Sequence, residues 1–139
     1  MLWNLTMEQS IILTGDGSHT IVVPGMHVSY HSKHGAIQES EHIFINAGLK
    51  KILEKKNDIA VFEMGFGTGL NALLTFTETV NTGINIYYET TELYPLDIPA
   101  ASALNYTEVL KTPDLHAIFT RLHTCEWNKP CPISGEFTF

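Results

Sequence analysis

The chain has 139 residues, of which 44% are hydrophobic and 17% are charged, so we expect one globular domain with a hydrophobic core. Its formal net charge of −7 argues against a surface built for broad contact with nucleic acid. Because no apolar run approaches the roughly 18 residues of a membrane-spanning helix, and the N-terminus lacks the pattern of a signal peptide, we expect neither a membrane segment nor a secretion signal.

The first 57 residues predict a β-hairpin followed by a helix. Two β-rich runs, at residues 11–13 and 20–23, flank the sequence GDGS, which is typical of a hairpin turn. Residues 35–57 carry apolar side chains at helical spacing, with a glycine at position 48. We therefore expect a helix with a break near Gly48, and we treat residues 1–57 as an N-terminal hairpin and helical extension.

Residues 58–139 predict strands alternating with helices. We expect strands at 59–64 and 84–88, and helices at 68–80, 95–104 and 113–122, with a further strand beginning in the tail GEFTF. This alternation is typical of α/β folds, in which crossover helices join the strands of a parallel sheet. A βαβ unit takes about 30 residues, so a complete doubly wound sheet would not fit. We expect an apparently truncated sheet.

Three glycines at alternate positions follow the first of these strands, in the sequence EMGFGTG. Glycine permits a tight turn and lets a ligand lie against backbone N–H groups at a helix N-terminus. A dinucleotide fold needs a small residue where Leu70 stands, and a Walker-type loop needs G-K-S/T, which is missing. The remaining spacing, from Glu63 to Gly69, resembles motif I of class I S-adenosylmethionine-dependent methyltransferases. A tight turn without a ligand is the structural alternative.

A second acidic residue is expected after the next strand, where dinucleotide folds bind ribose hydroxyls. The sequence ETTELYPLD supplies Glu89 and Glu92. Glu92 lies 23 residues after Gly69, close to the usual spacing of about 20 residues. We therefore assign Glu92 to the ribose, although an acidic residue at the end of a strand is common in any protein.

Four blocks in the same order sharpen the resemblance: TGDGSHT, YHSKHGAIQESEHIFINAGL, FEMGFGTGLNALLT and ETTELYPL. Together they resemble the methyltransferase domain of the bacterial enzymes that make 5-methylaminomethyl-2-thiouridine at the wobble position of tRNA. The resemblance runs from about Thr14 to Leu96. It implies a class I, Rossmann-like methyltransferase fold whose substrate is tRNA, and transfer of a methyl group to the amine of 5-aminomethyluridine.

The resemblance also implies a set of cofactor-binding residues. Those after the first parallel strand would hold S-adenosylmethionine, Glu92 would bind its ribose, and residues of the N-terminal block would line the pocket from the other side. This set consists of Tyr30, Ser32, Gly35, Glu39, Glu63, Gly65, Gly67, Gly69 and Glu92.

Two features of the family have no counterpart in this sequence. The family's Asp-x-Phe-x-Pro motif, which faces the target amine, is missing, and so is the acidic residue after the third strand. We therefore assign no catalytic residue, and we expect the 139-residue chain alone to be inactive. No flavin-oxidase segment is found, so we expect no flavin.

Other interpretations stay open. The chain can be a methyltransferase-like binding or scaffold module without activity, or a methyltransferase acting on a small amine. An open sheet edge would favour homo-oligomers. His27, His31 and His34 lie in a stretch that alternates like a strand, so we expect no metal site.

Cys125 and Cys131 are the only two cysteines. Two cysteines are too few for a disulfide framework, so we expect them to be thiols, either buried or at the surface. Such sparse use of cysteine is typical of proteins in a reducing compartment. We therefore expect a cytoplasmic protein.

Overall fold

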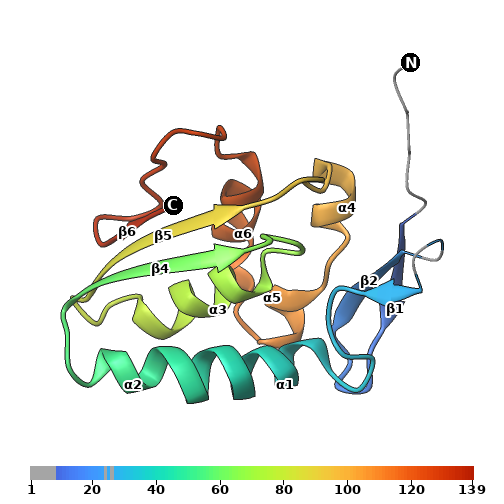
Figure 1. Cartoon of the computed structure of the whole chain (residues 1–139), viewed down its shortest axis with the longest axis horizontal. Helices are drawn as coiled ribbons and strands as arrows, with labels where there is room; N and C mark the ends of the chain where they lie inside the picture. Colours follow the sequence, from blue (N-terminus) through green and yellow to red (C-terminus); the bar gives the residue numbers. More distant parts are fainter. Residues whose placement is uncertain (1–8, 24, 26) are drawn as a thin grey trace.

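The fold is described from a computed structural model, which covers residues 9–23, 25 and 27–139 (Figure 1). A small antiparallel sheet begins the described chain. In this sheet β1 (Ser10–Leu13) pairs with β2 (His19–Val23), which confirms the predicted hairpin. A short strand that was not predicted, β3 (Val28–Ser29), pairs with the other edge of β2.

The turn of the hairpin caps the helix that follows. Three side chains of the turn accept hydrogen bonds from the first three backbone N–H groups of α1 (Ala36–Ser40), which have no partner within the helix. This contact fixes the small sheet against the end of the helix. The pairs are Thr14 Oγ1 with the N–H of Ala36 (3.2 Å), Ser18 Oγ with Ile37 (3.2 Å) and Asp16 Oδ2 with Gln38 (2.9 Å).

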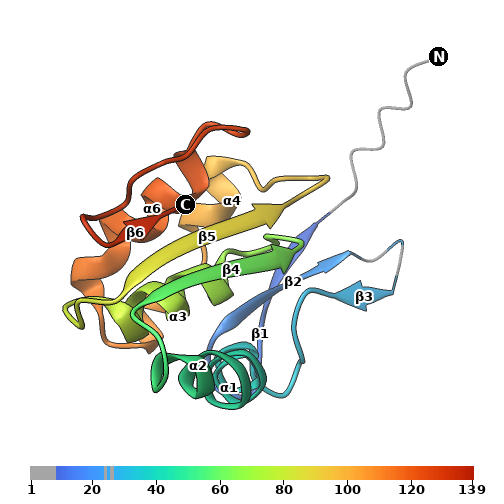
Figure 2. The same cartoon turned by 60° about the vertical axis from the view of Figure 1, so that its left-hand side comes forward.

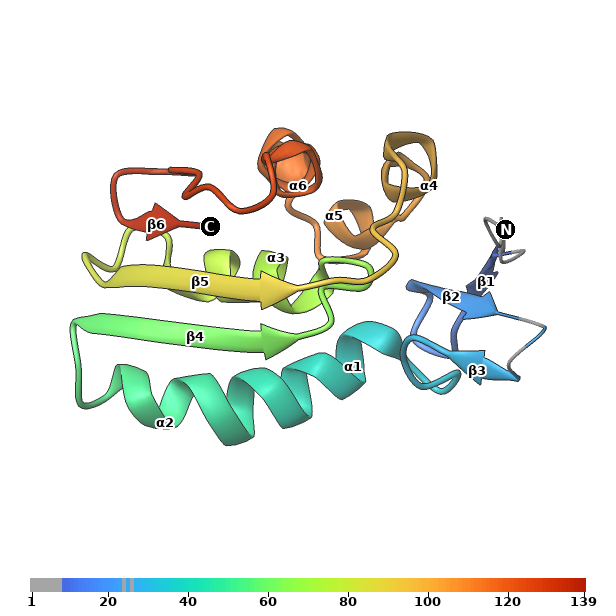
Figure 3. The same ribbon diagram turned by 45° about the horizontal axis from the view of Figure 1, so that its top comes forward.

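The predicted break near Gly48 is wrong. The chain stays helical from α1 through a π-helical segment, η2 (Glu41–Leu49), into α2 (Lys50–Leu53). Wider winding in the middle keeps Ile45 and Leu49 on the buried side, and their burial holds the intervening glycine in helical geometry. Figure 3 shows the resulting helix running along the β4 side of the second sheet.

The second sheet is parallel and confirms the predicted α/β class. It contains β4 (Asp58–Met64), β5 (Asn85–Thr91) and β6 (Phe137–Thr138), in the order β4-β5-β6. β4 pairs with β5 along its whole length, whereas β6 pairs with β5 only at its start.

The two faces of this sheet differ in burial. Alternate residues of β4 and β5, among them Ile59 and Tyr88, are buried under helices. On the opposite face Phe62 is 60% exposed and Met64 is 86% exposed. Figure 2 shows α3 and α6 behind the sheet, and in the described part of the chain no helix lies over the front of β4 and β5.

The connecting helices largely follow the predicted pattern. α3 (Leu70–Thr79) and α6 (His116–Thr124), the latter preceded by a 3-10 turn at Pro113–Leu115, confirm two of the predicted helices. The helix expected at 95–104 is instead α4 (Ile98–Ser102), followed separately by α5 (Tyr106–Val109).

The start of α4 has a local cause. The Asp97 carboxylate accepts the N–H of Ala100 at 2.8 Å, so the cap lies at Asp97 and not at the proline two residues earlier. Sequence reasoning placed the first turn at Pro95, because proline is favoured there. α4 therefore begins directly after Asp97, because the carboxylate of this cap residue accepts the N–H of Ala100, which has no partner within the helix.

One hydrophobic cluster joins the N-terminal extension to the parallel sheet's helices. Ile21 of β2 and Ile37 of α1 belong to the same buried cluster as Leu73 of α3 and Phe119 of α6. The predicted boundary between residues 57 and 58 stays a prediction. Among the described residues, no helix combines the length and the apolarity needed to cross a bilayer.

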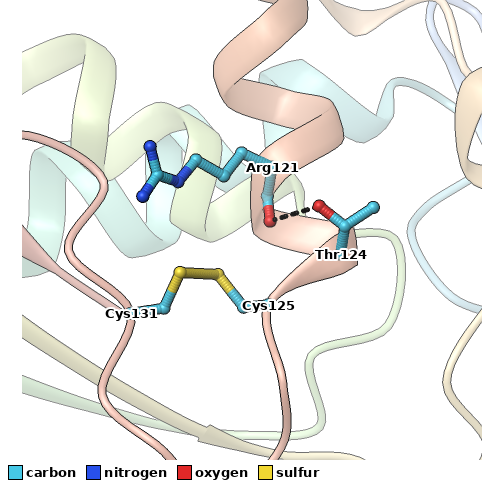
Figure 4. Close-up of a disulfide and its surroundings, with 4 residues drawn as sticks. All are labelled: Arg121, Thr124, Cys125 and Cys131. Carbon is cyan, nitrogen blue, oxygen red and sulfur yellow. Dashed lines mark hydrogen bonds between the residues drawn. A yellow bond between two sulfur atoms is a disulfide. The ribbon is translucent and has the colours of Figure 1, made fainter.

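The two cysteines form a disulfide, so the prediction of free thiols is wrong. Cys125 follows the last turn of α6, and the loop after it brings Cys131 back to a Cα–Cα distance of 6.0 Å, as Figure 4 shows. Asn128 turns this loop with a positive φ of 63°. The spacing of the two cysteines did not indicate the bond, because only the fold of the loop brings them together.

Candidate functional site

The glycine loop between β4 and α3 depends on left-handed backbone geometry. Gly65, Gly67 and Gly69 have φ angles of 90°, 57° and 75°, which favour glycine strongly over other residues. The loop is anchored to the next strand, because the N–H groups of Gly65 and Phe66 both donate to the Thr91 carbonyl oxygen, at 3.0 and 2.8 Å. The loop therefore stands at the carboxyl end of the sheet, where open α/β folds bind ligands.

Glu92 meets this loop from the end of β5. One of its carboxylate oxygens accepts the N–H of Gly67 at 2.8 Å, and the other accepts the N–H of Tyr94 at 2.9 Å. Two backbone donors thus hold the carboxylate in place, and each oxygen keeps a lone pair for a further donor. The structure brings together the two acidic positions, Glu63 and Glu92, that the sequence placed on neighbouring strands.

A pocket of about 510 Å³ opens beside the loop, within the range typical of small-ligand sites. The ring of Tyr30 reaches it from the N-terminal extension. Burial and the nearby charge of Glu92 raise the pKa of Tyr30. Of the predicted cofactor-binding residues, those that line the pocket are Tyr30, Glu63, Gly65, Gly67 and Glu92.

Glu63 is 8% exposed and is held by two side chains that sequence reasoning missed. Asn71 Nδ2 donates to one carboxylate oxygen and the Tyr88 hydroxyl to the other, both at 2.8 Å. Burial raises the pKa of Glu63, hydrogen bonds partly offset this effect, and the charge of Glu92 adds to it. The Glu63 carboxylate is therefore an acceptor in a fixed position. A cationic or N–H-bearing ligand beside it would stabilise its charged form.

The other predicted residues have different surroundings. The N–H of Ser32 donates to the Glu39 carboxylate at 2.7 Å, which holds the turn that follows Tyr30. A side chain at Gly35 would lie 2.7 Å from the Asp16 carboxylate, so glycine is needed there for packing. These three residues do not line the described pocket. Their role toward a ligand stays a prediction.

Gly69 lies behind the loop, against α6. A Cβ atom there would come within 2.9 Å of His123 Nε2 and of the Phe66 ring. His123 Nε2 is 3.1 Å from the Thr68 carbonyl oxygen, and burial lowers the pKa of His123 to about 4 despite this contact. A neutral imidazole that donates to Thr68 therefore supports the loop from the core.

Sequence signals exist for some of the missed residues. Asn71 belongs to the quoted glycine run, and the first turn of α3 points its amide back at the end of β4. Tyr88 lies on the buried face of β5, two residues before the Thr90 that pairs with Glu63. His31, which also lines the pocket, carried no such signal. Among the residues that the structure describes, no group of three or more His, Cys, Asp or Glu side chains is placed to hold a metal ion.

Comparison with known proteins supports the resemblance found in the sequence. The chain is 38% identical over 58 residues to the tRNA 5-methylaminomethyl-2-thiouridine biosynthesis bifunctional protein MnmC of Burkholderia multivorans, a match covering 41% of this chain and 9% of that protein. The protein of the same name from Burkholderia mallei is 35% identical over 68 residues, covering 48% and 10%. The matched part of the chain thus spans about a tenth of the length of these relatives. No family model matches the chain.

The fold has a counterpart among solved structures. The crystal structure of MnmC2 from Aquifex aeolicus superposes with a TM-score of 0.64, covering 97% of this chain and 42% of that one. At 23% identity this likeness shows the fold. The predicted fold class is thereby confirmed.

Proposed function

We propose that the chain carries the donor-binding part of an S-adenosylmethionine-dependent methyltransferase. The observation that supports this most is the convergence of Gly65 and Gly67, both with positive φ, with the carboxylates of Glu63 and Glu92 on one pocket. A simple tight turn would need the glycines but not two buried or anchored acidic residues beside them.

The pocket residues fit such a ligand. Gly65 has open space where a side chain would stand, so a ligand can approach the backbone there. Glu92 would accept the ribose hydroxyls with the lone pairs that its two backbone donors leave free. Glu63, held by Asn71 and Tyr88, would accept hydrogen bonds from the methionine end, where an ammonium group offsets the cost of its burial.

When bound, S-adenosylmethionine supplies a methyl group on a sulfonium, which a neutral amine takes up by in-line displacement. Such a reaction depends chiefly on positioning. The described residues contribute rigidity, because the loop is held by the Thr91 carbonyl oxygen, Glu92 and His123 together. We assign no catalytic base.

The acceptor that we propose is the aminomethyl group of the tRNA wobble uridine. The names of the Burkholderia relatives support this choice, since both refer to 5-methylaminomethyl-2-thiouridine biosynthesis. We propose a cytoplasmic location on the strength of these names alone, and not of the cysteines, because these form a disulfide. A binding module without activity is the second candidate, because the matched region amounts to a tenth of those relatives.

The experiment is transfer of labelled methyl from S-adenosylmethionine to tRNA that carries 5-aminomethyl-2-thiouridine. A form extended by the polypeptide that the Aquifex aeolicus protein has beyond the matched part should transfer label. The 139-residue chain alone should transfer none, with Glu63→Gln in the extended form as the donor-site control. Donor binding without transfer by the extended form would favour the binding module or a small-amine acceptor.

A further inference from the structure

His31 lines the pocket at the glycine loop, although it is not among the predicted cofactor-binding residues. It follows β3, in a stretch of the N-terminal extension that is held against β2. The N–H of Tyr30 donates to the Ile21 carbonyl oxygen at 2.9 Å, and the N–H of His31 donates to Thr20 Oγ1 at 3.0 Å. These two hydrogen bonds fix the backbone that carries the imidazole.

The Thr20 hydroxyl also sets which ring nitrogen of His31 carries the proton. Thr20 is fully buried, and its Oγ1 lies 3.5 Å from His31 Nδ1. This oxygen already accepts the His31 N–H, and in the described part of the chain Nδ1 is the acceptor within reach of its own hydrogen. A buried hydroxyl that donates to nothing is costly. Nδ1 therefore accepts, which leaves the proton of a neutral imidazole on Nε2.

The imidazole is a neutral donor on the side away from Thr20. Burial lowers the pKa of His31, although the negative charge of Glu39 acts in the opposite direction. The ring is therefore uncharged at pH 7. Among the described residues, Nε2 has no hydrogen-bond partner, whereas Nδ1 faces Thr20. An unpartnered donor on the wall of a pocket is suited to an acceptor on a bound ligand.

The charges in the pocket make such a donor necessary for an anionic group. Glu63 and Glu92 both line the pocket, and among the described residues that line it there is no lysine or arginine. Other side-chain donors are engaged or lie elsewhere. Asn71 Nδ2 donates to Glu63, and the Tyr30 ring packs beside Gly67, the residue whose N–H Glu92 accepts. The imidazole is thus the side-chain donor that remains for a ligand carboxylate.

We propose that His31 Nε2–H donates to the carboxylate of a ligand that ends in an amino-acid group, and so selects for that group. The inference rests on the proposed function, since S-adenosylmethionine ends in an ammonium and a carboxylate. Glu63 accepts from the ammonium, and His31 donates to the carboxylate. A lysine or arginine at this position would pair with the Glu63 carboxylate, whereas a neutral imidazole leaves that carboxylate to the ligand.

The test is calorimetric titration with S-adenosylhomocysteine and with its decarboxylated form, which keeps the amine. The wild-type chain should bind S-adenosylhomocysteine about tenfold more tightly than the decarboxylated form. His31→Phe keeps a ring of similar size but has no donor, so it should bind the two ligands about equally. Its affinity for the decarboxylated form should match that of wild type, which also shows that the variant is folded. His34→Phe is the matched control, because His34 is exposed and lies outside the pocket, and it should keep the wild-type preference.

Three results would overturn the proposal, and they differ in what else they reach. An unchanged preference in His31→Phe would show that another group binds the carboxylate, while the donor site itself would stand. Nitrogen NMR of the wild-type imidazole that finds the proton on Nδ1 would remove the donor without any ligand present. Absence of binding of both ligands by the wild-type chain would contradict the proposed function together with this inference.

Discussion

The carboxylate of Glu92 accepts the backbone N–H of Gly67 at 2.8 Å, so the end of β5 is tied directly to the glycine loop. The contact joins residues that are 25 positions apart in the sequence. Parallel pairing explains it, because β4 and β5 end at the same edge of the sheet, where Met64 pairs with Thr91. The acidic residue can therefore shape the loop and contact a ligand bound there.

Replacing Glu92 should weaken donor binding. Glu92→Gln keeps the shape but replaces one acceptor oxygen by an amide donor, so it cannot satisfy both backbone N–H groups and two ribose hydroxyls. We expect about a tenfold loss of affinity for S-adenosylhomocysteine, measured by calorimetry. Glu89→Gln is the matched control, since Glu89 is exposed and lies outside the pocket. Equal losses in both variants would contradict the assigned role.

A side chain at Gly67 should abolish binding. Its φ of 57° disfavours other residues, and a Cβ atom would lie 3.2 Å from the Tyr30 ring, at the mouth of the pocket. Gly67→Val should therefore bind no S-adenosylhomocysteine. Gly83→Ala is the control, because Gly83 has a φ of 74° but open space around it. Both should lose about 1–2 kcal/mol of stability from backbone strain, whereas only the first should lose binding.

The cap of α1 should make stability depend on acid pH. Burial acts to raise the pKa of Asp16, but hydrogen bonds from Ser18, Gln38 and Thr14 outweigh it and lower the pKa to about 2. Because the folded pKa lies below the unfolded value, this stabilisation is complete above about pH 4 and is lost as the pH falls toward 2.

Asp16→Ala should cost about 1 kcal/mol in urea unfolding at pH 7. The cost relative to wild type should shrink as the pH approaches 2. Asp58→Ala, at an exposed position on β4, is the matched control and should cost less. A cost for Asp16→Ala that is constant from pH 7 to pH 2 would show that the carboxylate is not the cap.

His123 should make the stability of the fold depend on pH in a second range, with the same sign as for Asp16. Its folded pKa of about 4 lies below the ordinary value of 6.5, so the unfolded chain binds the proton more readily. Stability should be complete above about pH 6.5 and should fall by about 2 kcal/mol as the pH drops toward 4. In His123→Gln the part of this slope due to the imidazole should vanish. Urea titrations of both proteins from pH 4 to pH 8 measure the difference.

The disulfide should contribute to stability and to the order of the glycine loop. Phe66 of that loop packs against Trp127, which lies within the loop that the disulfide closes, with ring centroids 6.4 Å apart. The double variant Cys125→Ser, Cys131→Ser should lose about 2 kcal/mol of stability, as expected for a short closed loop. A thiol reductant should lower the melting temperature of the wild type but not of the double variant.

Much of the fold could be predicted from local patterns. The strand 59–64 and the helix after the glycines follow from apolar runs and from the turn that joins them, and the structure confirms both. The π-helical winding through Gly48 could not be predicted, because it results from packing of Ile45 and Leu49 against distant residues. The disulfide likewise depends on a loop geometry that the spacing of Cys125 and Cys131 does not encode.

The candidate site was predictable where residues lie at the carboxyl ends of the parallel strands. Glu63 and Glu92 could be assigned from their spacing to the glycines, and both line the pocket. Asn71 and Tyr88 were missed, because their importance appears only when Glu63 is seen to be buried and in need of donors. The TGDGS block belongs to the sequence blocks that carry the resemblance, yet the side chains of Thr14, Asp16 and Ser18 cap a helix.

Calorimetric titration of the wild-type 139-residue chain with S-adenosylhomocysteine, beside the same titration with NAD, tests the central claim most directly. A donor site at the glycine loop predicts saturable binding of S-adenosylhomocysteine with one site per chain, no binding of NAD, and loss of the signal in Gly67→Val. Binding of NAD alone would instead support a dinucleotide site. No binding of either ligand by the folded chain would contradict the claim that these residues form a donor site.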